Sequence, residues 1–339
     1  GQEFSVPFTA YGQNAHYIVS DSISTNVTWL TDKPYVVLHA CVVGYTGKLT
    51  IPANCRVYMH QDARFFVYGE LSVNPTGKDS VVFQGDRLDR AYFGYEGYPG
   101  EWGGIYVVPG GLAKIKNAVI KNCGGSTPYH GYGIQPAAIE VDTAGLLVID
   151  HSRIENSIGY GVLSLQGNVH MSNCLVNSTG AQALAVIRGG YDSIVNCTFG
   201  NYGGTGLSHA NNTTVGILNY FNNGDGTWVP GDLDAVLRNC IIYGSLDSEV
   251  IYDSLGGATA RLRMDHCILK AGKIRPGFVQ FTDCIFNEDP KFANEQAKDY
   301  HLLDGSPAIG KGIAIPNLGK DLDGKTWGVP PDVGCYKFN

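Results

Sequence analysis

The chain has 339 residues, of which 44% are hydrophobic and only 16% are charged, and its formal net charge at pH 7 is −7. This acidic balance, without a run of basic residues, argues against nucleic acid or an anionic membrane surface as the partner. No stretch of about eighteen apolar residues occurs, so we expect no transmembrane helix. Glycine is abundant, with 45 residues, which together with the few charged residues favours an all-β protein rich in turns.

The N-terminal part is predicted to form a cap followed by short strands. We assign residues 1–35 to the cap because they lack the repeat described below. Alternating apolar residues then predict strands at 49–51, 57–59, 66–68, 71–73 and 81–83. Proline and glycine, such as Pro52 and Gly69, separate these strands.

An insertion near 86–102 combines aromatic with charged residues. Aromatic rings offer flat apolar faces to sugars, and carboxylates and guanidinium groups orient hydroxyls through charge-assisted hydrogen bonds. The insertion is therefore a candidate carbohydrate-binding site. Its candidate residues are Tyr92, Tyr95, Tyr98, Trp102, Asp86, Arg87 and Glu101. In the alternative interpretation, the aromatic residues only fasten the loop to the body of the protein.

From residue 120 onward the chain repeats a short phrase. An apolar residue and a variable residue are followed by Asn, His or Asp, and then by cysteine or serine. The phrase ends at Cys123, Ser152, Cys174, Cys197, Cys240, Cys267 and Cys284. We place one further copy at 217–220, inside the long step between Cys197 and Cys240. A period of about twenty-two strand-forming residues is typical of a solenoid.

The spacing inside the phrase predicts its geometry. The apolar residue and the cysteine lie three positions apart, so one straight strand cannot point both inward. The residue before the cysteine must therefore bend, and Asn, His and Asp tolerate left-handed backbone. Stacked copies predict an all-β, right-handed parallel β-helix of about eleven rungs over 36–290. The cysteines are expected to be reduced and buried in its core.

Basic residues on the outer strand faces are candidates for catalysis. Elimination at a uronate needs a base near the C5 proton and a cation that neutralises the carboxylate. Lys121, Arg238 and Arg263 are the candidates for these roles. In the alternative interpretation, the arginines only pair with neighbouring carboxylates such as Asp265.

A second insertion, near 201–234, carries acidic residues and a tryptophan. Asp225, Asp232 and Asp234 could supply oxygen ligands to Ca²⁺. Their spacing does not match an EF-hand, so turn formation is the favoured interpretation. Trp228 is a further carbohydrate-binding candidate.

The position after each cysteine should face outward, yet this column is largely apolar. Its apolar members are Leu175, Phe221, Ile241, Ile268 and Ile285. An exposed apolar stripe of this length needs a cover. We predict that residues 291–339 pack back along it, with a partner protein as the alternative occupant.

Two stretches resemble a known family. They are the tail, with motifs at 299–310, 321–324 and 331–336, and the middle stretch 82–105. Both are similar to secreted right-handed β-helix proteins of the choice-of-anchor Q type, common in Bacteroidetes. The tail departs from the pattern at Lys337, where an acidic residue commonly follows the tyrosine. The resemblance implies the β-helix fold, a secreted or cell-surface setting and frequent association with polysaccharides, the export signal having been removed. It implies no catalytic residues.

Three functional hypotheses remain open. The first is a secreted or surface-attached protein that binds a polysaccharide and could also process it. The second is a non-enzymatic adhesion or scaffold protein. The third is a polysaccharide lyase acting on a uronate-containing glycan, which fits better than a glycoside hydrolase because no strand carries the required pair of carboxylates. No cofactor is implied apart from the Ca²⁺ considered above.

Overall fold

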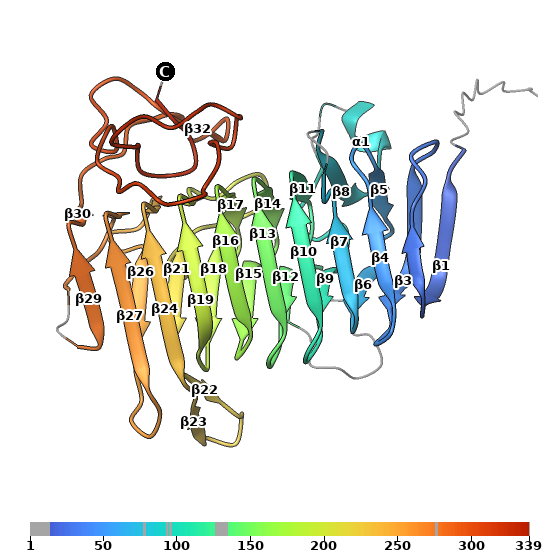
Figure 1. Ribbon diagram of the computed structural model, residues 1–339, viewed down its shortest axis with the longest axis horizontal. Coiled ribbons are helices and arrows are strands. Elements are labelled where there is room, and N and C mark those ends of the chain that lie inside the picture. The colour runs from blue at the N-terminus through green and yellow to red at the C-terminus, as the bar shows by residue number, and fades with distance from the viewer. Residues whose placement is uncertain are drawn as a thin grey trace, which may run out of the picture.

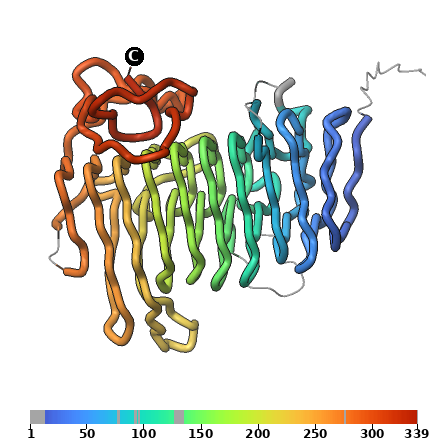
Figure 2. The backbone as a smooth tube through the Cα atoms, in the orientation of Figure 1, coloured from blue at the N-terminus to red at the C-terminus, as the bar shows by residue number. Residues whose placement is uncertain are grey.

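The computed structural model describes residues 14–76, 79–92, 94, 97–125, 135–274 and 277–338. The described chain coils into a rod of stacked rungs (Figure 1). Successive turns of the backbone lie side by side along the rod, as the tube in Figure 2 shows. Each complete rung contributes strands to three faces, so the molecule is a parallel β-helix.

The first face is a sheet of ten strands paired in sequence order. Its strands are β2 (Asn26–Thr28), β4 (Lys48–Ile51), β7 (Glu70–Val73), β10 (Leu112–Lys116), β13 (Leu146–Asp150), β16 (Asn168–Ser172), β19 (Gly190–Val195), β24 (Leu233–Arg238), β27 (Ala260–Asp265) and β29 (Val279–Thr282).

The other two faces belong to one sheet of eighteen strands, because β3 pairs with both β5 and β6. The second face holds β1 (His16–Ile23), β3 (Tyr35–Val43), β5 (Arg56–Met59), β8 (Val81–Gly85), β11 (Ala118–Lys121), β14 (Arg153–Ser157), β17 (Leu175–Thr179), β20 (Thr198–Asn201), β25 (Ile241–Gly244), β28 (Ile268–Leu269) and β30 (Ile285–Phe286). The third face holds β6 (Arg64–Val67), β9 (Gly104–Val107), β12 (Ala137–Val141), β15 (Tyr160–Leu165), β18 (Leu184–Ile187), β21 (Val215–Leu218) and β26 (Val250–Asp253).

A few elements lie off the rod. They are α1 (Asp89–Tyr92), the antiparallel pair β22 (Tyr220–Asn222) and β23 (Trp228–Pro230), and the antiparallel pair β31 (Phe292–Asn294) and β32 (Asp299–Leu302). Of the residues assigned to the N-terminal cap, 16–23 and 26–28 form β1 and β2, which pair in parallel with β3 and β4. Within the described residues, no helix has the length and apolar character needed to span a membrane.

The predicted bend before the core residue, at the corner between the first and second faces, is confirmed for six of the seven copies that end in cysteine or serine. These residues have φ between +45° and +65°, where Asn, His and Asp are tolerated and most other side chains are strained. They are His151, Asn173, Asn196, Asn239, His266 and Asp283, and Asn117 takes the same place in the rung before His151. We call them the bend column.

Two predicted copies of the phrase are wrong. Residues 120–123 end a strand of the second face, because Lys121 is aligned with Glu155, and the bend that follows the first face in this rung is Asn117. Residues 217–220 do not form a strand and bend of the first face, because β21 lies on the third face between β18 and β26. The strand β19 pairs directly with β24, so Cys197 and Cys240 belong to neighbouring rungs despite their separation in sequence. The second insertion therefore loops out of a single rung.

The interior of the rod is one continuous apolar cluster, to which the cysteines belong. Cys123, Cys174, Cys197, Cys240 and Cys267 are fully buried, and all nine cysteines are free thiols. Buried thiols donate weak hydrogen bonds to carbonyl groups of a neighbouring rung, as Cys240 Sγ does to Ile194 O at 3.6 Å. The cysteines therefore act as small core residues.

The C-terminal segment, residues 291–338, lies along the outside of the second face (Figure 1). It buries the apolar column at Leu175, Ile241 and Ile268, which are 2%, 1% and 0% exposed. Tyr300 packs where Gly200 has no side chain, because a Cβ there would lie 2.1 Å from the Tyr300 ring. The segment thus covers the column at these three column residues, whereas Ile285 is only half-buried. Phe221 departs from the column, since it lies on β22 and is 39% exposed.

The bend column also holds this segment. The side chain of Asn239 donates to Ile313 O at 2.7 Å and accepts from Ile313 N at 2.8 Å. Asn173 donates to Leu318 O, and His151 lies 2.9 Å from Lys320 O. The residues that turn the backbone therefore also dock the C-terminal segment.

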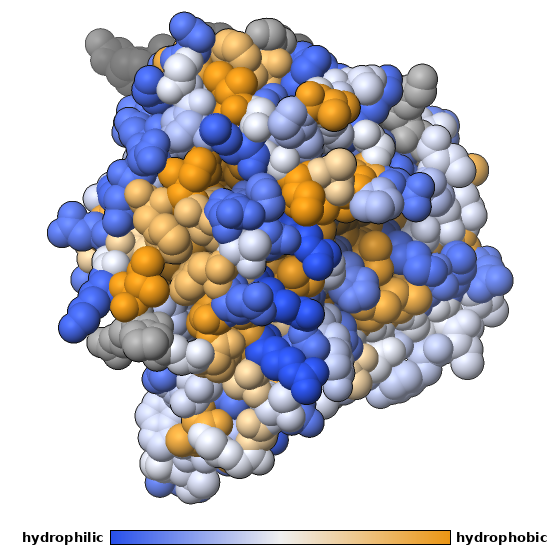
Figure 3. Space-filling model, turned by 60° about the vertical axis from the view of Figure 1, so that its left-hand side comes forward, coloured by the Kyte–Doolittle hydropathy of each residue, from blue (hydrophilic) through white to orange (hydrophobic). Residues whose placement is uncertain are grey.

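At the far end of the rod the last rung is only partly covered. Phe278, Phe281 and Phe286 are half-buried against the core and contact one another and Tyr252 edge-on. Figure 3 brings this end forward and shows hydrophobic patches interrupted by hydrophilic residues. The C-terminal segment lies beside this end of the rod, over its outer surface (Figure 1).

Asp192 breaks the apolar interior. It is 3% exposed on β19, and its Oδ1 accepts a hydrogen bond from Val169 N, while Oδ2 finds no partner among the described residues. Burial raises the pKa of Asp192 to about 8, against the opposing effect of the Val169 hydrogen bond. The folded protein therefore holds a proton here that the unfolded chain releases near pH 3.8.

We predict that the Asp192 carboxyl lowers the free energy of unfolding as pH rises from about 4 to about 8, because the unfolded chain loses its proton first. Asp192→Asn should remove that loss and raise the free energy of unfolding above pH 8 by up to about 5 kcal/mol, because the amide never ionises. Urea unfolding at several pH values measures the effect. The exposed Asp247→Asn is the control and should leave the pH profile unchanged. Parallel profiles for Asp192→Asn and the unmodified protein would refute the assignment.

Candidate functional site

A cavity of about 540 Å³ lies between the first insertion and the C-terminal segment. We call it the first cavity. The insertion with α1 rises from the rod on the same side as the C-terminal segment, with a gap between them (Figure 1). The outward side chains of β8, β11, β14 and β17 form the floor of this cavity, including Gln84, Lys121, Glu155 and Leu175. Its volume lies within the range of ligand-binding cavities, about 300–1,000 Å³.

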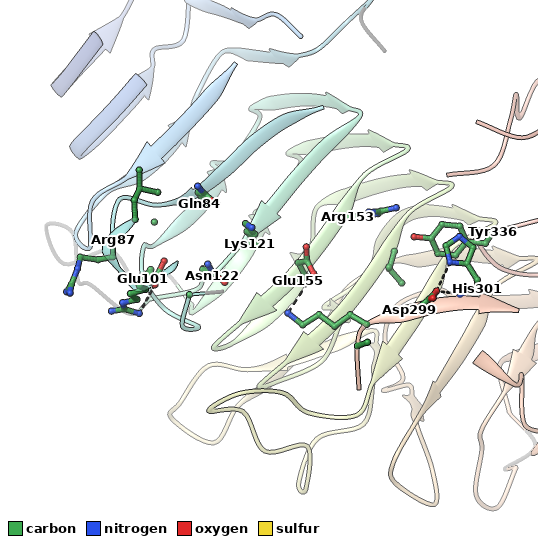
Figure 4. A pocket seen from close by; sticks show the side chains of 17 residues that line it. Gln84, Arg87, Glu101, Lys121, Asn122, Arg153, Glu155, Asp299, His301 and Tyr336 are labelled. Carbon is green, nitrogen blue, oxygen red and sulfur yellow. Dashed lines mark hydrogen bonds and ion pairs between the residues drawn. The ribbon is translucent and has the colours of Figure 1, made fainter. Parts of the chain in front are cut away.

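Parallel register sets the spacing of the floor. Lys121 is aligned with Glu155 on the next rung, and Arg153 with Leu175 on the rung after that. Neighbouring strands are about 4.8 Å apart, so these side chains form short rows along the rod. Figure 4 shows Lys121 between Arg87 and Glu101 on one side and Arg153, His301 and Tyr336 on the other.

The first cavity is rich in positive charge. Its cationic residues are Arg87, Arg90, Lys121, Arg153 and Lys298, and its carboxylates are Glu101, Glu155 and Asp299. Two of the cations have close carboxylate partners within it. Arg90 Nη1 lies 2.6 Å from Glu101 Oε1, and Lys298 Nζ lies 3.9 Å from Glu155 Oε2.

Arg153 and Lys121 are held less tightly. Arg153 Nη2 lies 3.5 Å from Asp323 Oδ1, outside the cavity lining, and its side chain is 42% exposed. The ammonium group of Lys121 has no ion pair or hydrogen bond with any described residue. Lys121 is therefore a half-buried cation that can bind an anionic ligand without breaking an existing ion pair.

Glu101 fixes the first insertion onto the rod. It is 9% exposed, and its Oε1 accepts hydrogen bonds from Arg90 and from Tyr98 N at 3.0 Å. Burial raises the pKa of Glu101, against the opposing effects of the Tyr98 amide and Arg90. A Cβ at Gly85 would lie 2.2 Å from Glu101 Oε2, so glycine makes room for the carboxylate.

Most aromatic and charged candidates of this insertion do not face the first cavity with a free side chain. Trp102 is 0% exposed within the core, and its indole N–H donates to Lys121 O at 2.9 Å. Arg90 covers the ring of Tyr98 at 4.4 Å from the centroid. Asp86 pairs with His60 at 2.7 Å, and Arg87 pairs with Asp89 at 2.8 Å.

Two further candidates cannot be placed. Tyr95 lies outside the described residues, as does the side chain of Tyr92 at the end of α1. Trp102 fits the alternative interpretation, since it attaches the insertion to the rod, whereas Tyr98 contacts Arg90 and Glu101 within the insertion itself. Trp102 cannot stack on a sugar because it has no accessible face.

We predict that Trp102→Ala lowers the free energy of unfolding by about 3–5 kcal/mol, because it leaves a cavity in the core. Tyr98→Ala should cost far less, since that ring is half-exposed. Thermal or urea unfolding of both variants measures the difference. Equal, small losses would show that Trp102 is not part of the core.

The opposite wall of the first cavity is built around His301. Its Nδ1 lies 2.5 Å from Asp299 Oδ1, and its Nε2 lies 2.8 Å from Asp323 Oδ2. The imidazole stacks on Tyr336 with a centroid distance of 4.0 Å. Burial lowers the pKa of His301, but the hydrogen bonds to Asp323 and Asp299 outweigh it and the pKa is raised overall.

We predict that the C-terminal segment is docked most firmly when His301 is protonated. The contribution is complete below the pKa of an unfolded histidine, near 6.5, and is lost as pH rises through the raised folded value. Limited proteolysis of the segment should therefore accelerate between about pH 6 and pH 9. His301→Asn should abolish this pH dependence, and the control His170→Asn, at an exposed strand position, should keep it. A pH dependence that survives in His301→Asn would contradict this role.

The other candidates are not in the first cavity. Arg238 and Arg263 lie on the first face, where Arg238 is 3.6 Å from Asp265 and Arg263 is 2.5 Å from Asp234. Trp228 is 53% exposed on the β22–β23 hairpin, which projects from the rod away from the C-terminal segment (Figure 1). Of the three basic catalytic candidates, only Lys121 lines the first cavity.

The candidate Ca²⁺ ligands are engaged elsewhere. Asp225 accepts a hydrogen bond from Thr227 N and Asp232 accepts one from Thr259 N, both at 2.8 Å. Asp234 lies between Arg261 and Arg263. No three His, Cys, Asp or Glu side chains gather into a metal site within the part of the chain that the structure describes. The turn interpretation therefore describes Asp225, whereas Asp232 joins two segments that are distant in sequence.

The comparison with family models agrees with the fold. The family model described as "Right handed beta helix region" matches residues 137–288. The fold is thus the right-handed parallel β-helix predicted from the repeat. Among solved structures, the chain is similar to the pectate lyase Pel9A at 10% identity and a TM-score of 0.36, over 96% of each chain. Similarity at this level says nothing about the substrate of this chain. No curated protein matches the chain.

Proposed function

We propose that the first cavity binds an acidic glycan, with a uronate carboxylate held by Lys121 and Arg153. The observation that carries the proposal is a reversal of charge. The protein as a whole has a formal charge of −7, yet the described residues that line this cavity include five Lys or Arg side chains and three carboxylates. A cavity of this sign concentrates anions from solution.

Two features of the cavity favour a glycan as the anion. The floor is long and polar because it crosses several rungs, which suits an extended chain with many hydroxyl groups. Lys121 and Arg153 face a ligand with charged donors, and Gln84 and Asn122 add amide groups. Such a ligand implies that the protein acts outside the cytoplasm, as expected for a secreted or surface-attached protein.

The lyase hypothesis belongs to the same cavity, since elimination would need these cations to neutralise the uronate. The adhesion hypothesis could use either a long face of the rod or the apolar column, and the C-terminal segment covers most of the column, so only the long face is left to it. We therefore place glycan binding first and treat cleavage as a result that the same experiment can detect.

We predict that oligogalacturonate or oligoalginate binds to the intact protein and that Lys121→Ala weakens binding about tenfold, the loss of about 1.4 kcal/mol expected for one charge-assisted contact. Isothermal titration calorimetry measures the change. Lys114→Ala is the matched control, because it removes the same charge from the first face, where Lys114 pairs with Glu70 at 3.2 Å.

Binding should also weaken with added salt and be absent for a neutral glycan of the same length. New ultraviolet absorbance from an unsaturated uronate would assign lyase activity to the same cavity. Equal affinities for Lys121→Ala and Lys114→Ala, or no binding to either acidic glycan, would disprove the proposal.

A further inference from the structure

A second cavity, of about 720 Å³, adjoins the first one. The two share Gly97, Ala297 and Lys298 as lining residues, so they are neighbouring parts of one groove. Three stretches that are remote in sequence wall the second cavity: the end of the first insertion, residues 202–207 of the second insertion, and residues 295–298. The second insertion thus contributes to the groove through its first residues, and not through its acidic residues or Trp228.

The wall from the second insertion is well supported. Asn201 is fully buried, and its amide donates to Thr179 O at 2.8 Å and to Thr179 Oγ1 at 3.0 Å. Gly204 and Leu207 exchange backbone hydrogen bonds of 3.2 and 3.0 Å, which close a tight turn. This turn leans toward the first insertion, since a Cβ at Gly206 would lie 4.0 Å from Pro99. The cavity is therefore a built part of the fold.

The two cavities differ in their chemistry. Among the described residues, the second cavity has one carboxylate, Glu295, and one cation, Lys298. The other polar side chains are hydroxyls and amides. Thr205 and Gln296 are exposed, whereas Asn156 and Ser178 are buried and donate hydrogen bonds to Asn122 and Asn177. Lys298 is already paired with Glu155 of the first cavity, since its Nζ lies 3.9 Å from Glu155 Oε2. A carboxylate entering the second cavity would therefore lose water without gaining an unengaged cation, and it would approach Glu295.

We propose that the two cavities are neighbouring subsites with different preferences, the first for a uronate and the second for a neutral sugar. The ligand class is then a heteroglycan in which uronic acid is linked to neutral sugar, and not a chain of uronates alone. This inference rests on the proposed function and refines it. The amides and hydroxyls of the second cavity match the donors and acceptors of sugar hydroxyl groups.

The test compares two oligosaccharides of equal length, one of uronate only and one alternating uronate with a neutral sugar. The unmodified protein should bind the alternating glycan about tenfold more tightly by calorimetry. Thr205→Lys places a cation in the second cavity and should reverse this preference by strengthening binding of the uronate chain. Thr227→Lys is the matched control, since it adds the same charge at an exposed position of the β22–β23 hairpin and should leave the preference unchanged.

Gln296→Lys adds a cation from the opposite wall and should act like Thr205→Lys, so the test does not depend on one variant folding correctly. Equal binding of both glycans by the unmodified protein, with Lys121→Ala still weakening both, would overturn this inference and leave the proposed function intact. A preference that neither lysine variant changes would also overturn it. No binding to either glycan would overturn both proposals.

Discussion

The left-handed residue at the corner between the first and second faces is the constraint on which the structure depends. It turns the chain from the first face of the rod into the second without exposing either neighbour, and Asn, His and Asp adopt that backbone at low cost. Because the rungs stack in register, the bends form a column with outward amides. Those amides hold the C-terminal segment, as Asn239 does through two hydrogen bonds to Ile313. The residues of the bend column therefore also bind the C-terminal segment, which builds one wall of the first cavity.

The groove follows from this docking and from the rigidity of the rod. Strands fix Lys121, Arg153 and Glu155 on the floor at rung spacing, whereas loops and the C-terminal segment supply the walls. Burial of Tyr300 over Gly200 holds the wall that carries His301. On the other side, Glu101 and Trp102 hold the first insertion by a buried carboxylate and a core indole. A rigid floor with fastened walls suits recognition of an extended polar ligand.

The sequence predicted the fold far better than the site. The phrase around each cysteine specified bend, core and outer positions, because side-chain direction alternates with a fixed period along a strand. Its two errors, the copies at 120–123 and 217–220, arose where apolar strands of the second and third faces are followed by Asn122 and Asn219, which imitate the phrase. For the site, aromatic content pointed to Trp102, which packs in the core. Arg153 was overlooked, although it is a charged residue in the otherwise apolar or small column that follows each cysteine or serine.

Local sequence by itself determined the repeat, the buried thiols, the bends and the need for a cover over the apolar column. These depend on which side of one strand a residue faces, and that is encoded within a few positions. Only the tertiary structure decided which outward residues share a cavity. Lys121, His301 and Thr205 come from three distant segments, and their proximity depends on how the loops and the C-terminal segment pack on the rod. Arg238 and Lys121 occupy equivalent positions in the phrase, yet Arg238 is on the first face and Lys121 is on the second, because residues 120–123 lie at the next corner of the rung, where Asn122 stacks on Asn156.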